Sequence, residues 1–353
     1  MSRLLAAIFA CAFALGVLGA VLYLQHAAIP QHAAAANKQA DTPADKNKGD
    51  GDDDDDASDA AASKWPDDAG TPEQVMYAQA ALMQDALKAL QPRAAGRPNL
   101  YLIGFAGDGS ENVFRNEVEF VQRQFSQRFD AAGRTLLLIN NPDTLTRVPL
   151  ASLSNLQIAV DEAAQRMNAD EDILFLFLTS HGSREHELYV GGLDPLPLDQ
   201  IAPDDLADVF TKSAIRYRVI VISACYSGGF IDALKNDTTM VITAARADRT
   251  SFGCGTQSEI TDFGRAFFVD GLNHNDSFEA AFDEASHLVD SWESRDDETH
   301  SYPQIEAGPA IKARLKAWRA GLHLGPPLPF RTSTPPHQSD GASLTAMLAP
   351  IPR

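Results

Sequence analysis

His181 and Cys225 are the two side chains of this sequence whose surroundings favour nucleophilic chemistry. Each follows an apolar run that ends abruptly, residues 173–178 before His181 and residues 219–222 before Cys225. Two such runs separated by a helix-length stretch are typical of neighbouring parallel strands in a buried sheet. Paired strands lie about 4.8 Å apart, and open α/β sheets bind ligands beyond the carboxyl ends of their strands. We therefore expect the imidazole and the thiol to meet there.

The residues next to this pair could supply the other parts of a thiol-dependent site. A cysteine nucleophile needs a base nearby or a lowered pKa, and donors for the oxyanion that forms when a carbonyl is attacked. Gly182 leaves an unobstructed backbone N–H beside the histidine, and Gly228 and Gly229 follow Cys225 where the strand must turn sharply into a helix. The amino end of that helix should favour the thiolate.

Simpler interpretations of both residues exist. Of the three cysteines, Cys11 lies in an apolar amino-terminal run, which leaves Cys225 and Cys254 for the folded part. Two cysteines cannot build a disulfide framework or a four-cysteine zinc site, but they could pair with each other. His181 could be an ordinary hydrogen-bonded loop residue. Their equivalent positions on successive strands favour chemistry, and we expect neither a metal nor another cofactor.

Strand-like and helical segments alternate regularly through the middle of the chain. This alternation predicts one α/β domain with a doubly wound, mostly parallel sheet and helices on both faces. The patterns predict strands at residues 100–105, 135–139, 173–178, 219–222 and 240–243, and helices at 72–91, 111–129, 152–167, 203–212, 262–272 and 277–292.

The two ends of the chain differ from the middle in composition. Residues 31–70 are rich in Ala, Asp, Lys and Gly and should form a solvated linker, because they cannot bury enough apolar surface to fold. Residues 71–323 form the predicted domain, and the proline-rich residues 324–353 are expected to be a disordered tail. The formal net charge of −19 disfavours binding to nucleic acid.

Residues 1–30 contain a candidate membrane segment. Residues 4–24 carry no charge, and about 20 such residues span a bilayer, whereas a cleaved signal has an apolar core of roughly 7–15 residues. We expect a single uncleaved amino-terminal anchor, with a cleaved signal and a secreted protein as the alternative. Because Arg3 precedes the span and acidic residues follow it, the domain should lie outside the cytoplasm, in a periplasm or lumen.

The residues around His181 and Cys225 resemble motifs of the legumain-like cysteine peptidases. This family has a caspase-like fold and includes the asparaginyl endopeptidases and the catalytic subunit of the GPI-anchor transamidase. The resemblance extends from about Asn99 to Asp290. Its most specific parts look like the family's His-Gly and Ala-Cys-x-Ser-Gly motifs, and they are Leu178-Thr179-Ser180-His181-Gly182-Ser183 and Ser223-Ala224-Cys225-Tyr226-Ser227-Gly228.

The resemblance implies roles for individual residues. His181 would be the catalytic base and acid, Cys225 the nucleophile, and the backbone N–H groups of Gly182 and Cys225 the oxyanion hole. Substrate binding would involve Arg115, which matches an arginine on the family's first helix, together with Ser251 in the stretch Ser251-Phe252-Gly253-Cys254.

Two further substrate-binding positions depart from the family. Tyr226 stands where legumains have an acidic residue, and Arg265 falls, after one gap, on a pocket aspartate. A pocket that contains Arg115 and Arg265 should prefer an acidic residue before the scissile bond to asparagine. In the alternative alignment Arg265 points to solvent and Asp262 supplies the acidic group.

The sequence as a whole predicts a membrane-anchored cysteine endopeptidase that hydrolyses polypeptides through a thioester on Cys225, with His181 as its partner. One alternative is a transamidase or peptide ligase on the same site, in which an amine resolves the thioester. The other is a catalytically silent, tethered α/β binding module.

Overall fold

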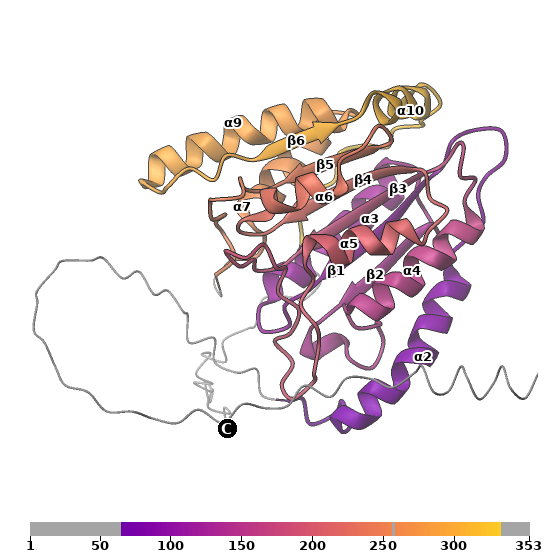
Figure 1. The fold of residues 1–353 in the computed structure, drawn as a ribbon, viewed down its shortest axis with the longest axis vertical. Helices are drawn as coiled ribbons and strands as arrows, with labels where there is room; N and C mark the ends of the chain where they lie inside the picture. Colours follow the sequence, from indigo (N-terminus) through magenta and orange to yellow (C-terminus); the bar gives the residue numbers. More distant parts are fainter. Residues whose placement is uncertain (1–64, 256–257, 333–353) are drawn as a thin grey trace, which may run out of the picture. The chain divides into compact units, whose positions relative to one another are not determined.

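The structure is a computed structural model that describes residues 65–255 and 258–332. In this part of the chain a six-stranded sheet has the order β2-β1-β3-β4-β5-β6. The strands up to β5 pair in parallel, and β6 runs antiparallel to β5 (Figure 1). The bounds are Leu100–Ala106 for β1, Thr135–Ile139 for β2, Ile173–Thr179 for β3, Tyr217–Ser223 for β4, Thr239–Thr243 for β5 and Gln304–Ala307 for β6.

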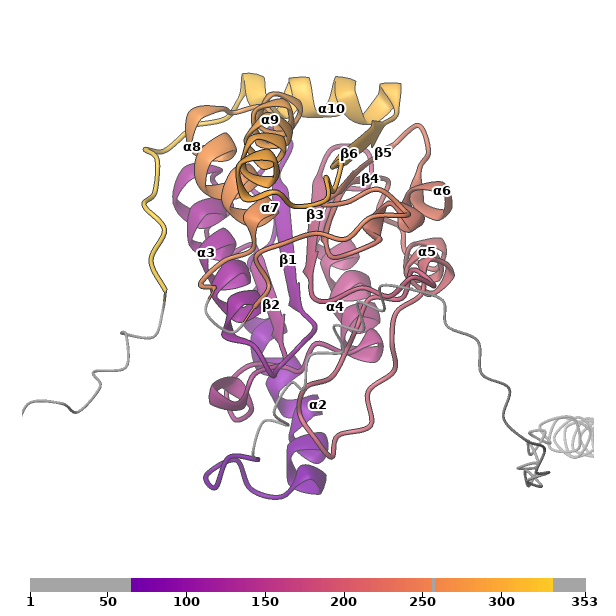
Figure 2. The same cartoon turned by 90° about the vertical axis from the view of Figure 1, so that its left-hand side faces the viewer.

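Helices cover both faces of the sheet (Figure 2). One apolar core lies beneath α3 (Asn112–Arg128), α9 (Phe278–Asp296) and α10 (Pro309–Ala320). The other lies beneath α2 (Pro72–Ala89), α4 (Leu153–Arg166), α5 (Pro203–Thr211) and α6 (Ile231–Leu234). Every residue of β3 is buried, because side chains that point to either face meet a helical layer. The predicted doubly wound α/β fold is therefore confirmed.

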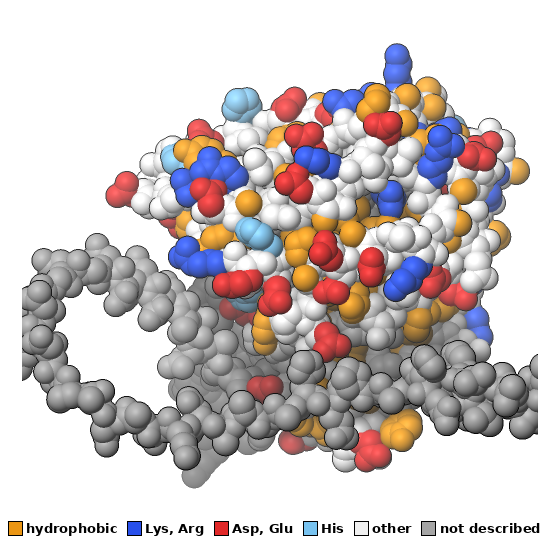
Figure 3. All heavy atoms as spheres, viewed as in Figure 1, with side chains coloured by type: hydrophobic (Ala, Val, Ile, Leu, Met, Phe, Trp, Pro, Cys, Tyr) orange, Lys and Arg blue, Asp and Glu red, His pale blue; other side chains and the backbone are white. Residues whose placement is uncertain are grey.

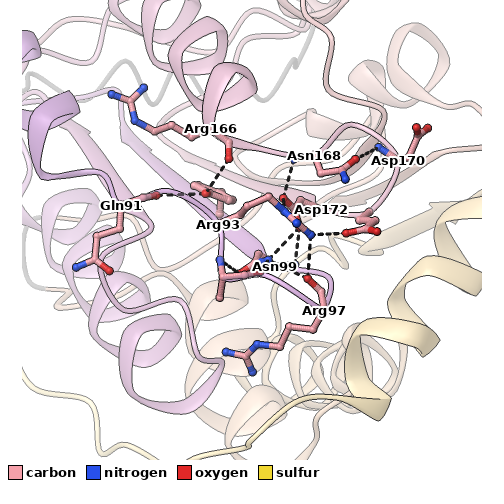
Figure 4. A network of polar contacts seen from close by, with 11 residues as sticks. Gln91, Arg93, Arg97, Asn99, Arg166, Asn168, Asp170 and Asp172 are labelled. Carbon is pink, nitrogen blue, oxygen red and sulfur yellow. Dashed lines mark hydrogen bonds and ion pairs between the residues drawn. The ribbon is translucent and has the colours of Figure 1, made fainter.

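A buried carboxylate fixes the amino end of β3, as Figure 4 shows. Asp172 accepts hydrogen bonds from the backbone N–H groups of Asn99, at 2.7 Å, and of Asn168, at 2.7 Å. It also accepts one from the Arg93 guanidinium at 3.0 Å. Because a guanidinium and two backbone N–H groups satisfy this buried carboxylate, the network locks β1 and β3 together at the end opposite to His181 and Cys225.

The carboxyl-terminal part of the domain differs from the sequence prediction. Strand β6 and helix α10 were not predicted. Residues 325–332, assigned to the disordered tail, pack instead against α3 and the short helix α8 (Leu272–His274). Gly325 donates its N–H to the Arg128 carbonyl at 2.9 Å, and the Phe330 ring meets the edge of Phe120. These contacts extend the packed domain beyond its predicted end at residue 323.

Three smaller helical segments position residues discussed below. A four-residue 3₁₀ helix, η2 (Ser227–Phe230), follows the Cys225 turn, and α7 (Asp262–Gly264) leads through a π-helical turn, η3 (Arg265–Gly271), into α8.

Acidic and basic side chains are interspersed over the face shown in Figure 3.

The predicted anchor and most of the predicted linker lie outside the described residues. Within residues 65–255 and 258–332, no helix combines the length and the apolar character needed to cross a bilayer. The anchor and the location of the domain outside the cytoplasm remain predictions.

Candidate active site

Strands β3 and β4 bring the two sequence motifs together. The strands pair in parallel with Thr179 opposite Ser223, so His181 and Cys225 each follow the paired end of their strand at the same distance. Both side chains line one small pocket at the carboxyl edge of the sheet. Both residues therefore lie at the same edge of the sheet, and the sulfur that interacts directly with the His181 imidazole is that of Cys254.

Gly182 and Cys225 make a backbone contact that only glycine permits. A Cβ atom built on Gly182 would lie 2.1 Å from the carbonyl oxygen of Cys225, far inside the van der Waals contact distance. The Ser180 N–H also donates to the Ser223 carbonyl at 3.2 Å, just before the two loops diverge. The oxyanion-hole candidates Gly182 and Cys225 are thus direct neighbours.

The Cys225 thiol is held against the backbone of Ser251. The Ser251 N–H donates to Sγ at 3.3 Å, and Sγ lies 3.5 Å from the Ser251 carbonyl oxygen. Burial raises the pKa of the Cys225 thiol, and the neighbouring Cys254 acts in the same direction. The net shift is therefore opposite to the lowering that we expected from a helix amino end, and the helix after Cys225 is only the short η2.

Two carboxylates flank the His181 imidazole. Its Nε2 lies 3.5 Å from Oδ2 of Asp108 and 3.6 Å from Oε2 of Glu111. The Phe114 ring packs against the imidazole edge-on, with centroids 5.2 Å apart. Glu111 Oε2 is buried without a hydrogen bond within the described residues, so the imidazole is the group that can compensate its charge.

These neighbours hold a proton on His181. Burial has the largest single effect and lowers the pKa of the imidazole. The hydrogen bond and the charge of the Cys254 sulfur, the hydrogen bond of the Glu111 carboxylate and the charge of Asp108 raise it more strongly, to about 10. An imidazolium at neutral pH is able to donate a proton to a leaving amine.

Sequence reasoning missed Asp108 and Glu111 as parts of the site, and it treated Cys254 only as a possible disulfide partner. Cys254 lines the pocket with His181 and Cys225, and both Cys225 and Cys254 are free thiols. The sequence did contain a signal for the two acids. They follow β1, whose Ala106 pairs with Thr179 of β3, so both lie at the same edge of the sheet as His181.

The predicted substrate-binding residues are not all brought together. Ser251 lines the pocket. Tyr226 directly follows Cys225 in a left-handed conformation with φ of 55°, and the Arg184 guanidinium lies 5.4 Å from its ring centroid.

Arg115 and Arg265 do not form one pocket. Arg115 is buried, and its Nη1 donates to Asn141 at 2.8 Å and pairs with Asp143 at 2.6 Å. Arg265 lies over Trp292, 5.8 Å from a ring centroid, and lines a separate cleft that also contains Asp262. We had expected Arg115 and Arg265 to form one pocket without acidic neighbours, which would bind an acidic residue of the substrate. That expectation is wrong.

The residues described by the structure contain no cluster of three or more His, Cys, Asp or Glu side chains that could hold a metal ion. The chemistry that this arrangement offers comes from the thiol, the imidazolium and the backbone N–H groups.

Comparison with known families supports the interpretation of this pocket as the site of a cysteine peptidase. A buried, mostly parallel sheet with a histidine and a cysteine after adjacent strands is an arrangement suited to a cysteine peptidase. Residues 157–311, which contain both motifs, match the model of the Peptidase C13 family. The resemblance to the legumain-like peptidases is thereby confirmed, and a cysteine peptidase is supported.

Among solved structures, the crystal structure of caspase-1 from Spodoptera frugiperda is similar to this chain at 13% sequence identity, with a TM-score of 0.42. The similarity covers 60% of this chain and 88% of that chain. No curated protein sequence matches the chain.

Proposed function

We propose that this protein is a cysteine endopeptidase that cleaves polypeptides with Cys225 as nucleophile and His181 as proton donor and acceptor. The observation that carries the proposal is the register of β3 and β4, which directs both side chains into one pocket. The match to a peptidase family over the segment that contains both motifs supports the same reaction class.

The proposed reaction has two stages. The Cys225 thiolate attacks the peptide carbonyl carbon, and the N–H groups of Gly182 and Cys225 stabilise the oxyanion. His181 then donates its proton to the departing amine as the C–N bond breaks, which leaves a thioester. Water attacks the thioester while His181 accepts a proton, the C–S bond breaks, and the carboxylic acid product leaves with Cys225 restored.

The surroundings of the two groups favour His181 as the acid in the first stage. Cys254, Glu111 and Asp108 together keep the imidazole protonated, since they raise its pKa to about 10. Burial raises the pKa of Cys225, so the thiol and not the thiolate predominates at neutral pH. Loss of the thiol proton is thus a separate requirement for attack, and cleavage should accelerate as pH rises above neutrality.

The decisive experiment compares Cys225→Ala with Cys254→Ala, since the two thiols line the same pocket. Hydrolysis of a fluorogenic peptide library should disappear in the first variant and persist in the second. A peptide with a carbonyl-directed electrophile should label Cys225 in the wild type. Loss of activity in Cys254→Ala with retention in Cys225→Ala would assign the nucleophile to Cys254 and overturn the proposal.

The same assay separates hydrolysis from the alternatives. Mass spectrometry of products formed with an added amine would show amide products for a transamidase and free acids for a peptidase. A binding module would give neither product and no adduct on the folded protein.

A further inference from the structure

A buried carboxylate lies behind the candidate site and contacts neither His181 nor Cys225. Glu117 of α3 has no solvent exposure, and its position among the apolar residues of that helix points it at the sheet. Oε2 accepts a hydrogen bond from the Thr179 hydroxyl at 2.5 Å, and Oε1 accepts one from the Thr261 hydroxyl at 2.6 Å. Both hydroxyls are themselves buried.

These two threonines connect Glu117 to both halves of the site. Thr179 is the last residue of β3, two positions before His181. Thr261 caps α7, lines the pocket, and lies 3.1 Å, hydroxyl to hydroxyl, from Ser223, the last residue of β4 and two positions before Cys225. A hydrogen-bonded chain therefore runs from the end of β3 through Glu117 and Thr261 to the end of β4.

When Glu117 is ionised, hydrogen counting fixes the direction of this hydrogen-bonded chain. Thr261 has one hydroxyl hydrogen, which it donates to Glu117, and its oxygen accepts the Gly264 N–H at 2.9 Å. Ser223 must then be the donor to Thr261. A protonated Glu117 would have to donate a hydrogen bond to one of the two threonine hydroxyls, and that hydroxyl could then no longer donate to Glu117. The direction of the hydrogen bonds in this chain therefore depends on the protonation state of Glu117.

The space around Glu117 is specific for its side chain. A Cβ atom built on Gly264 would lie 1.5 Å from Oε1, so α7 can approach the carboxylate only through a glycine. The groups that contact the carboxyl from β3 and α7 are hydroxyls, the Thr261 backbone N–H and this glycine. Desolvation raises the pKa of Glu117 to about 7, although the threonine hydrogen bonds oppose the shift. Burial of an ionisable acid in such surroundings destabilises the fold, which indicates that Glu117 has a functional role.

We infer that Glu117 is a positioning residue that sets the distance between His181 and Cys225 by joining the carboxyl ends of β3 and β4 through Thr179 and Thr261. The inference deepens the proposed peptidase function and rests on it. Reaction rates depend steeply on the alignment of the reacting groups. Loss of a hydrogen bond from this chain should therefore reduce turnover more than it reduces substrate binding.

The test uses Glu117→Gln, which keeps the shape of the side chain and one acceptor oxygen. We expect kcat for a fluorogenic peptide to fall between about tenfold and a hundredfold, with KM changed by less than about threefold. Asp172→Asn is the matched control, because Asp172 is also a buried, hydrogen-bonded carboxylate but lies at the opposite end of β3. That variant should lose stability and retain the wild-type kcat.

A second pair of variants keeps the test open if Glu117→Gln does not fold. Thr179→Val removes the hydroxyl that Glu117 accepts from, with little change in shape, and Thr179→Ser restores it. Turnover should fall in Thr179→Val and recover in Thr179→Ser. Equal kcat in the valine and serine variants, or a wild-type kcat in folded Glu117→Gln, would overturn the inference. Absence of Cys225-dependent cleavage in the wild type would instead overturn the proposed function.

Discussion

Gly182 lies so close to Cys225 that a methyl group on its Cα would meet the Cys225 carbonyl oxygen at 2.1 Å. The contact joins the histidine loop to the cysteine loop through backbone atoms, which cannot rearrange as a flexible side chain can. The distance between the two candidate catalytic residues therefore depends on the absence of a side chain at this position.

Gly182→Ala should consequently separate the two loops. We expect kcat/KM to fall by roughly a hundredfold, since displacement of reacting groups by about 1 Å can have that effect. Gly255→Ala is the control, because nothing lies within 4 Å of a Cβ at Gly255 and its φ is not positive. Peptidase assays together with thermal unfolding would test this. Near wild-type activity in Gly182→Ala would show that the loops tolerate separation.

Removal of the Glu111 charge should shift the alkaline limb of the pH profile of kcat/KM. Glu111 raises the pKa of His181, so Glu111→Gln should lower that pKa and deprotonate the imidazolium at a lower pH. We expect the alkaline limb of kcat/KM to move down by roughly one pH unit. The exposed Glu185→Gln variant is the control and should leave the limb in place. An unchanged limb in Glu111→Gln would mean that Glu111 does not act on the imidazole.

Cys254 should affect the reactivity of Cys225 without being required for catalysis. It raises the pKa of the Cys225 thiol, so Cys254→Ala should lower that pKa and increase the thiolate fraction at neutral pH. Alkylation of Cys225 by iodoacetamide, followed by mass spectrometry across a pH series, should show a midpoint at lower pH than in the wild type. A midpoint at higher pH would contradict the prediction that Cys254 raises the pKa of Cys225.

The elements around the site could be predicted because their patterns are local. The apolar run of β3 is buried on both faces, and a run of this kind is recognisable without any partner. Strand β6 could not be predicted in this way, because Gln304–Ala307 is a short edge strand that is defined by its pairing with β5. Helix α10 also went unpredicted, although Pro309–Ala320 falls inside the predicted domain of residues 71–323.

The chemistry of the site was only partly predictable. The reactive residues His181 and Cys225 could be placed because strand register carries them to one edge. The direction of a long side chain cannot be read from an alignment, and so Arg115 was assigned to a substrate pocket although its guanidinium pairs with Asp143. Glu117 did carry a signal, because it is a charged residue within the apolar stripe of an amphipathic helix.

The buried carboxyl of Glu117 should make stability depend on pH in a direction opposite to that of a salt-bridged acid. Its pKa is raised from 4.5 to about 7 by desolvation, so the folded state binds the proton more tightly than the unfolded chain does. The contribution to stability is fully present below pH 4.5 and is lost as pH rises through about 7. Each pKa unit corresponds to about 1.4 kcal/mol, so the loss approaches roughly 3 kcal/mol at alkaline pH. Glu117→Gln does not ionise and should not show this loss. Denaturant unfolding of the wild type and of Glu117→Gln at pH 4, 6 and 8 should therefore give a difference in the free energy of unfolding that grows in favour of the variant with pH. A difference that is constant over this range would show that Glu117 does not titrate within it.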